Sequence, residues 1–138
     1  MARILSIDYG KKRTGIAVTD TLQIVPGGLA TVATCELMKF LRDYVAHENV
    51  ERIVVGEPRR LNGEPSENLA RVHQFVATWR KQMPSIPIEL YDERFTSVLA
   101  HKTILDSGIG KKARQNKALV DEISATIILQ DYLRMRSR

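Results

Sequence analysis

The order of strand-like and helix-like segments is the feature that most restricts how this chain can fold. Strands come first, and the alternation of apolar residues predicts three of them, at 3–8, 14–19 and 28–33. Helices and strands then alternate, with helices at 36–47 and 66–81 and strands at 52–56 and 86–91. Two more helices are predicted, at 96–106 and 116–135. This order predicts an α/β sandwich with a five-stranded mixed sheet whose first three strands are antiparallel.

Helical spacing of apolar residues identifies the faces that should be buried. In the first helix that face comprises Leu37, Phe40, Leu41, Tyr44 and Val45. In the second it is predicted to comprise Leu69, Val72, His73, Val76 and Trp79. Trp79 is interpreted as a core residue rather than as a stacking platform for a nucleic-acid base.

Length and composition limit the class of protein. The 138 residues are enough for one domain, predicted to span 1–138, and 43% of them are hydrophobic. The longest apolar runs are far shorter than the roughly 20 residues of a membrane span, and no signal peptide is recognised. The single cysteine, Cys35, has no partner for an internal disulfide. We therefore expect a cytoplasmic protein without a membrane partner.

Basic residues are clustered and give a net charge of +5. Such clusters suit a polyanion, so phosphates of a nucleic acid are candidate partners, although a solvated surface explains the composition equally well. Tyr9 precedes the first cluster and has the chemistry to stack on a substrate or hydrogen-bond to it. The candidate phosphate-binding residues are Lys11, Lys12, Arg13, Arg59, Arg60, Lys111, Lys112, Arg114 and Lys117.

Asp8 ends the apolar run 4–7, which is typical of a central buried strand. A carboxylate there costs several kcal/mol in desolvation unless it is paired or bound to a cation. Gly10, two residues later, lets backbone or ligand approach closely. The alternative is that Asp8 simply closes the strand and caps the turn.

Two further positions supply carboxylates that could meet Asp8. Asp92 and Glu93 follow the fifth strand, and strand alternation directs only one of them towards any given face. Asp121 lies early in the last helix, on the same face as the core-like residues Ala125, Ile128 and Tyr132. Glu122 points about 100° away and suits a rim position.

Three converging carboxylates would repel one another, and hard divalent cations with oxygen ligands relieve that repulsion. The pattern favours Mg²⁺ or Mn²⁺, with two ions being the usual arrangement for phosphodiester hydrolysis. His47, His73 and His101 have no partner at ligand spacing and are interpreted as structural or surface residues, which argues against zinc.

At these residues the chain resembles the YqgF family, also called RuvX, of the ribonuclease H-like superfamily. The matching blocks are 7–17, 54–58, 62–63, 92–97 and 120–125, and together they extend over essentially the whole chain. The resemblance implies a ribonuclease H-like three-layer sandwich and an acidic triad at Asp8, Glu93 and Asp121. It also implies a nuclease that processes the 5′ end of the small-subunit ribosomal RNA precursor or resolves Holliday junctions.

The chain departs from the family pattern at Glu57, where an apolar residue is expected. Glu57 is therefore either an additional metal ligand or a loop charge paired with Arg59 or Arg60. Two other classes of function stay open at this point. One is a non-catalytic nucleic-acid-binding module, and the other is an actin-like phosphotransferase or ATPase. The choice between RNA and DNA also stays open, as does a homodimer, which a junction resolvase would need in order to cut two strands.

Overall fold

The structure is a computed structural model that describes residues 2–57, 68–92 and 117–136, with side chains of the last helix from residue 120 onward. The first strands are β1 (Arg3–Tyr9), β2 (Arg13–Thr19) and β3 (Pro26–Ala33). A 3-10 helix, η1 (Thr34–Glu36), leads into α1 (Leu37–His47). The remaining described elements are β4 (Val50–Glu57), α2 (Leu69–Gln82), β5 (Ile88–Asp92) and α5 (Lys117–Arg136). The helix predicted at 96–106 lies outside the described residues.

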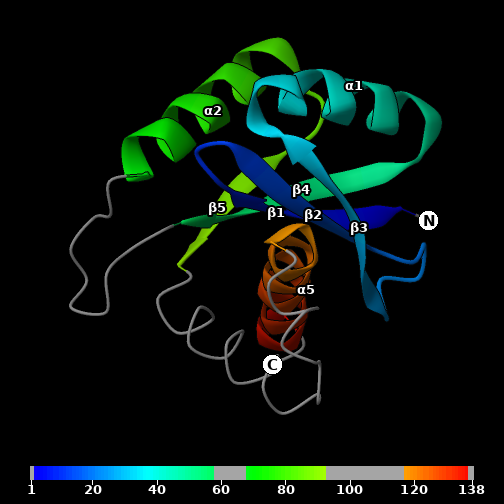
Figure 1. The fold of residues 1–138 in the computed structure, drawn as a ribbon. Coiled ribbons are helices and arrows are strands. Elements are labelled where there is room, and N and C mark those ends of the chain that lie inside the picture. The colour runs from blue at the N-terminus through cyan, green and yellow to red at the C-terminus, as the bar shows by residue number, and fades with distance from the viewer. Residues whose placement is uncertain (1, 58–67, 93–116, 137–138) are drawn as a thin grey trace.

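The five strands form one mixed sheet in the order β3-β2-β1-β4-β5. β1 is antiparallel to β2 and parallel to β4, while β2 is antiparallel to β3 and β4 is parallel to β5. Helices α1 and α2 cover one face of the sheet and α5 covers the other, which gives three layers (Figure 1). The predicted sandwich with an antiparallel start is therefore confirmed. No helix in the described part of the chain is long and apolar enough to cross a membrane.

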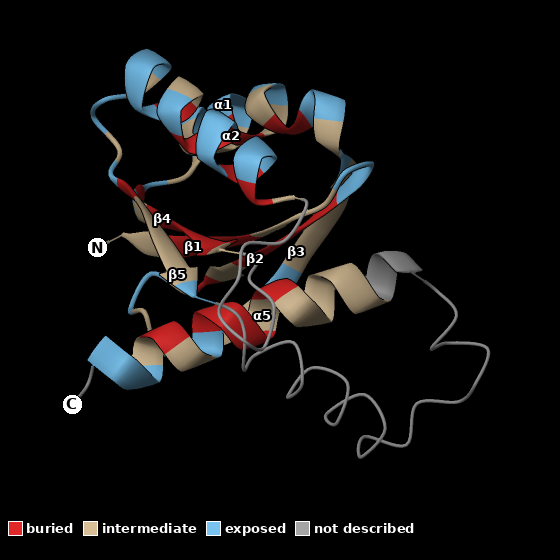
Figure 2. Ribbon diagram, turned by 90° about the vertical axis from the view of Figure 1, so that its left-hand side faces the viewer, coloured by how far each residue is buried: buried red, intermediate tan, exposed pale blue. Residues whose placement is uncertain are grey.

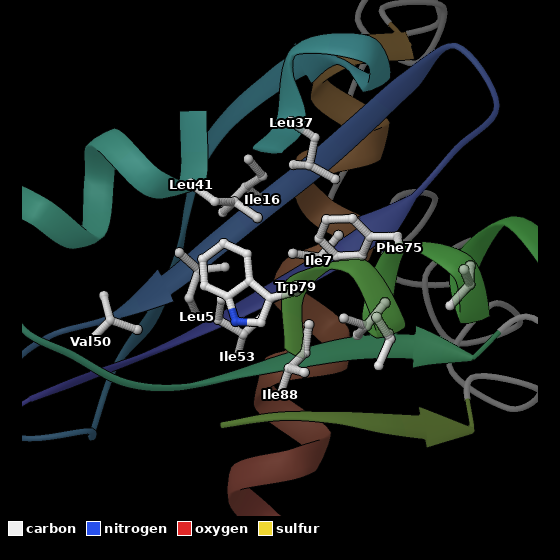
Figure 3. Packing of buried hydrophobic residues seen from close by; sticks show 13 residues of the cluster. Leu5, Ile7, Ile16, Leu37, Leu41, Val50, Ile53, Phe75, Trp79 and Ile88 are labelled. Carbon is white, nitrogen blue, oxygen red and sulfur yellow. The ribbon is translucent and has the colours of Figure 1, made fainter. Parts of the chain in front are cut away.

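Trp79 lies at the centre of the layer between the sheet and the helices α1 and α2 (Figure 3). Its side chain is fully buried, and its indole Nε1 donates a hydrogen bond to the carbonyl of Ile86 at 3.1 Å. The prediction that Trp79 is a core residue is confirmed. The prediction that His73 belongs to the buried face of the helix is wrong, since His73 is exposed and Phe75 is buried in this layer instead. His73 lies on the outer side of the helix, where its ring reaches Glu57.

Helix α5 packs on small residues of β1 and β2. Ser6 Oγ donates a buried hydrogen bond to the backbone carbonyl of Ala125 at 2.7 Å, and Ala17 belongs to the same buried cluster. At Gly15 the helix backbone is so close that an added Cβ would overlap the carbonyl group of Asp121. The side of α5 that faces the sheet is buried, whereas its last turn is exposed (Figure 2). Small side chains on the sheet therefore determine how close α5 lies.

We predict that Gly15→Ala destabilises the protein by about 1–3 kcal/mol, the usual range for overpacking a tight core. The new methyl group forces α5 away from β2, since it meets rigid backbone rather than a flexible side chain. Gly27→Ala is the matched control, because a Cβ at Gly27 has no heavy atom within 4 Å. Urea denaturation of the three proteins gives the comparison. Equal destabilisation by both substitutions would show that the close approach at Gly15 does not limit the packing.

Candidate active site

Strand alternation directs Asp8 and its neighbour Tyr9 to opposite faces of the sheet. Ile4 packs in the cluster beneath α5, and Asp8 shares its side of β1. Leu5 and Ile7 belong to the cluster beneath α1 and α2, against which Tyr9 also packs. The end of β1 therefore presents a carboxylate on the α5 face and an aromatic ring on the α1/α2 face.

Asp8 and Asp121 come together because of the tight packing at Gly15. Gly15 is the pairing partner of Asp8 across the β1–β2 ladder, and the backbone of Asp121 lies directly on it. Burial, and then the charge of the Asp121 carboxylate, raise the pKa of Asp8 from 3.8 to about 6. The structure thus brings together two of the three carboxylates that the sequence indicates.

Among the described residues, a cation from the hairpin contacts one member of this pair. Arg13, the first residue of β2, donates from Nε to Asp121 Oδ2 at 2.8 Å, and the Asp121 side chain is 22% exposed. Lys11 and Lys12 are exposed in the turn that precedes Arg13. Gly10 is needed there, since a Cβ would overlap the carbonyl of Arg13. Two oxygen-donor carboxylates beside an exposed basic turn form a site with the chemistry to hold a hard cation and receive an anion.

Strand alternation directs Glu57 to the face of the sheet opposite Asp8. It ends β4 on the same side of the strand as Ile53 and Val55, which pack beneath α1 and α2. Its Oε2 lies 3.1 Å from His73 Nε2, so one of its partners is a histidine of α2. Asp92 pairs with Glu57 in the β4–β5 ladder, and strand alternation directs it to the same face as Ile88.

Several predicted site residues lie outside the described residues or have undescribed side chains. Glu93 follows β5 directly, and Lys117 begins α5. The described residues alone contain no group of three His, Cys, Asp or Glu side chains placed to hold a metal. The other predicted residues outside the described ranges are Arg59, Arg60, Lys111, Lys112 and Arg114.

Two interactions at the site were missed by sequence reasoning. The Arg13–Asp121 ion pair joins residues 108 positions apart, and no local pattern in the sequence indicates it. Asn68, which precedes α2, donates from Nδ2 to the carbonyl of Tyr9 at 2.6 Å and so holds the end of β1. An asparagine ahead of a helix signals a helix cap, but the structure uses its amide across the fold instead.

The fold is shared with a protein whose structure has been solved with a Holliday junction. The structure of T. thermophilus RuvC in complex with a Holliday junction substrate matches with a TM-score of 0.55 and 15% sequence identity. The match covers 98% of this chain and 96% of that chain. It confirms the predicted ribonuclease H-like fold.

The sequence matches are closer. A protein of Bacteroides fragilis named "Putative pre-16S rRNA nuclease" is 60% identical over 133 residues, which cover 96% of both chains. A protein of the same name from Phocaeicola vulgatus is 62% identical over the same length and coverage. The family model described as "RuvX: Holliday junction resolvase" matches residues 2–135. This chain therefore belongs to the RuvX family of Holliday junction resolvases.

Proposed function

We propose that this protein is a metal-dependent endonuclease that hydrolyses phosphodiester bonds at the 5′ end of precursor 16S ribosomal RNA. The observation that carries the proposal is the pair of carboxylates, Asp8 and Asp121, beside the basic turn at Lys11 and Lys12. The RNA substrate is supported by the names of relatives that share 60% or more of their residues with this chain. The working compartment that suits this substrate is the cytoplasm.

Resolution of branched DNA is the second candidate activity, and the description of the family model favours it. A resolvase acts on two strands, so this candidate requires a homodimer with two copies of the site. A non-catalytic nucleic-acid-binding module is less consistent with the geometry, because two bare carboxylates without a cation repel phosphate.

We propose Asp8, Asp121 and Glu93 as the ligands of two Mg²⁺ or Mn²⁺ ions. Glu93 is included because it directly follows β5 in the sequence and because the resemblance to the RuvX family implies an acidic ligand at this position. The donor set fits a hard cation, since Asp8 and Asp121 are oxygen ligands, and burial followed by the charge of Asp121 raises the pKa of Asp8. When bound, such ions supply an acidified water for attack and positive charge for the leaving oxygen.

The chain's own residues orient the substrate. Lys11 and Lys12, which are exposed, bind phosphates of the substrate, while Gly10 keeps the turn compact. Arg13 neutralises Asp121 in the protein without metal, and it would have to share that carboxylate with any bound cation. Arg13 can then also pair with a phosphate, so the same residue has a role before and after binding.

Cleavage should require a divalent cation and the proposed ligands. We expect Asp8→Asn, Asp121→Asn and Glu93→Gln each to lower the rate by about a thousandfold or more, as removal of a catalytic group does. Glu122→Gln is the matched control, because Glu122 lies next to Asp121 but is directed towards Gly28 of β3. The measurement compares cleavage of labelled precursor rRNA and of branched DNA, with Mg²⁺ or Mn²⁺. Undiminished cleavage in excess chelator would overturn the mechanism.

Asp8 should weaken the metal-free fold at neutral pH. Its pKa rises from 3.8 to about 6 on folding, so the cost is absent below pH 3.8 and complete above about pH 6. We predict that Asp8→Asn stabilises the metal-free protein by about 1–3 kcal/mol at pH 7.5, the upper value being the full conversion of the shift. This gain should vanish at pH 3.5.

The measurement is denaturant unfolding with chelator present at both pH values. Glu122→Gln should leave the stability unchanged within about 0.5 kcal/mol, as most surface substitutions do. Added Mg²⁺ should then raise the melting temperature of the parent protein more than that of Asp8→Asn, since ligand binding stabilises the folded state. An Asp8→Asn variant that is less stable than the parent at pH 7.5 would make Asp8 a structural residue.

The basic turn should contribute to the salt dependence of binding. The double variant Lys11→Gln/Lys12→Gln should reduce the slope of log K against log salt by about 0.9 for each phosphate of duplex DNA that it no longer neutralises. The matched control is Lys39→Gln/Arg42→Gln, which removes two exposed charges from α1. Both are measured in the Asp8→Asn background without metal, so that no cleavage occurs. An unchanged slope for the first variant would exclude the turn as the binding surface.

A further inference from the structure

A depression of about 290 Å³ opens between α1 and α2, on the face of the sheet opposite Asp8. Its volume is at the small end of the roughly 300–1,000 Å³ typical of ligand pockets. Tyr9 lines it at the end of β1, so the depression lies at the same end of the sheet as the carboxylates. The residues that matter for its chemistry are Tyr9, Cys35, Arg71, Gln74, Phe75 and Thr78.

The lining combines the half-buried ring of Tyr9, which packs on the buried Phe75, with a single cation among the described residues. The rings of Tyr9 and Phe75 lie with their centroids 5.5 Å apart at an interplanar angle of 36°. Burial raises the pKa of the Tyr9 hydroxyl, and the charge of Arg71, which lines the same depression, partly offsets that rise. Gln74 and Thr78 add an amide and a hydroxyl from the same helix.

The residues that line the depression indicate which class of ligand fits it. Arg71 is the only charged residue among the described residues that line the depression, so a cationic ligand is disfavoured. Aromatic rings stack on nucleobases, arginine pairs with phosphate or stacks on a base, and an amide hydrogen-bonds to a base edge. The volume admits one base rather than a folded segment of protein. The combination therefore fits a single unpaired nucleotide.

The depression is also joined to the basic turn. Thr34, at its rim, donates from its backbone N–H to the carbonyl of Lys12 at 2.9 Å and from its hydroxyl to the carbonyl of Gly10 at 2.7 Å. Asn68 fixes the carbonyl of Tyr9 at 2.6 Å from the α2 side. A nucleic-acid strand that leaves the depression over this turn meets Lys11 and Lys12, and then the Asp8 face of the sheet.

We propose that the depression between α1 and α2 binds an unpaired base of the nucleic-acid substrate, while the neighbouring nucleotides cross the basic turn to the carboxylates. The choice of ligand class rests on the proposed function. The binding itself does not depend on cleavage. A base held here would favour substrates with a single-stranded segment next to the cutting site, because a paired base cannot enter the depression without unpairing.

Cys35 gives a direct readout of occupancy, since it is exposed, lines the depression and is the only cysteine in the chain. The experiment measures the rate at which neutral iodoacetamide alkylates Cys35 in the Asp8→Asn protein without metal. The probe is a short polyuridine oligonucleotide, compared with an abasic oligonucleotide of the same length. We expect saturating polyuridine to slow alkylation several-fold and the abasic strand to leave the rate nearly unchanged.

Arg71→Gln should raise the polyuridine concentration needed for half-protection about tenfold, in the range found when one residue that stacks on a base is removed. Arg42→Gln is the matched control, because Arg42 is exposed on α1 and does not line the depression. Phe75→Leu keeps the core filled and should weaken protection as well. Circular dichroism verifies that each variant is folded.

The inference is overturned if polyuridine binds without protecting Cys35, if the abasic strand protects equally, or if Arg71→Gln and Arg42→Gln behave alike. Failure of the inference and failure of the proposed function are distinguishable. Protection of Cys35 in a protein that cleaves no substrate would leave the base site standing and remove the nuclease. Metal-dependent cleavage without protection of Cys35 would support the proposed nuclease activity and contradict the proposed base site.

Discussion

The close approach of the α5 backbone to Gly15 is the constraint on which the rest of the site depends. A helix can lie this close to a sheet only where the side chains beneath it are small, and this face offers glycine, serine and alanine in the right places. The buried hydrogen bond from Ser6 then fixes the position of the helix along the sheet. Close packing of α5 on the sheet holds Asp121 beside Asp8, although the two carboxylates repel each other.

The electrostatic cost of this arrangement is not removed by the fold. Two carboxylates are kept near each other in a partly buried place, and the pKa of Asp8 rises as a result. The Arg13 guanidinium balances Asp121 at the open side. The structure therefore keeps the repulsion at Asp8 and neutralises the charge at Asp121, which leaves one carboxylate in need of a cation and the other already paired.

The fold could be predicted from the sequence because apolar periodicity and element order are local signals. The five strands, their mixed pairing and the burial of Trp79 all follow from them. The prediction for His73 fails because helical periodicity allows a residue at the edge of the apolar stripe either to pack or to face outwards. Glu57 could not be placed until strand parity was known, and the structure directs it to His73.

Interactions between residues far apart in the chain could not be predicted from the sequence. The close approach at Gly15, the Arg13–Asp121 pair and the bond from Asn68 to Tyr9 depend on how complete elements dock. The depression beside Tyr9 has the same origin, since β1, η1 and α2 each supply part of its wall. Asp8 could be recognised as a candidate from the sequence, because a carboxylate at the end of a buried strand has a desolvation cost that a partner or a cation must offset.

The distance along the chain between the two halves of the site has a consequence for biosynthesis. The hydrogen bond from Ser6 to Ala125 attaches α5 to β1 and joins residues that are 119 positions apart. It can form only after nearly all described elements have left the ribosome. Until then the nascent chain exposes the apolar underside of its sheet at Ile4, Ala17 and Val54. During that interval a chaperone has this exposed apolar surface to bind. Whatever reaction the finished site performs cannot begin before Ala125 has been translated.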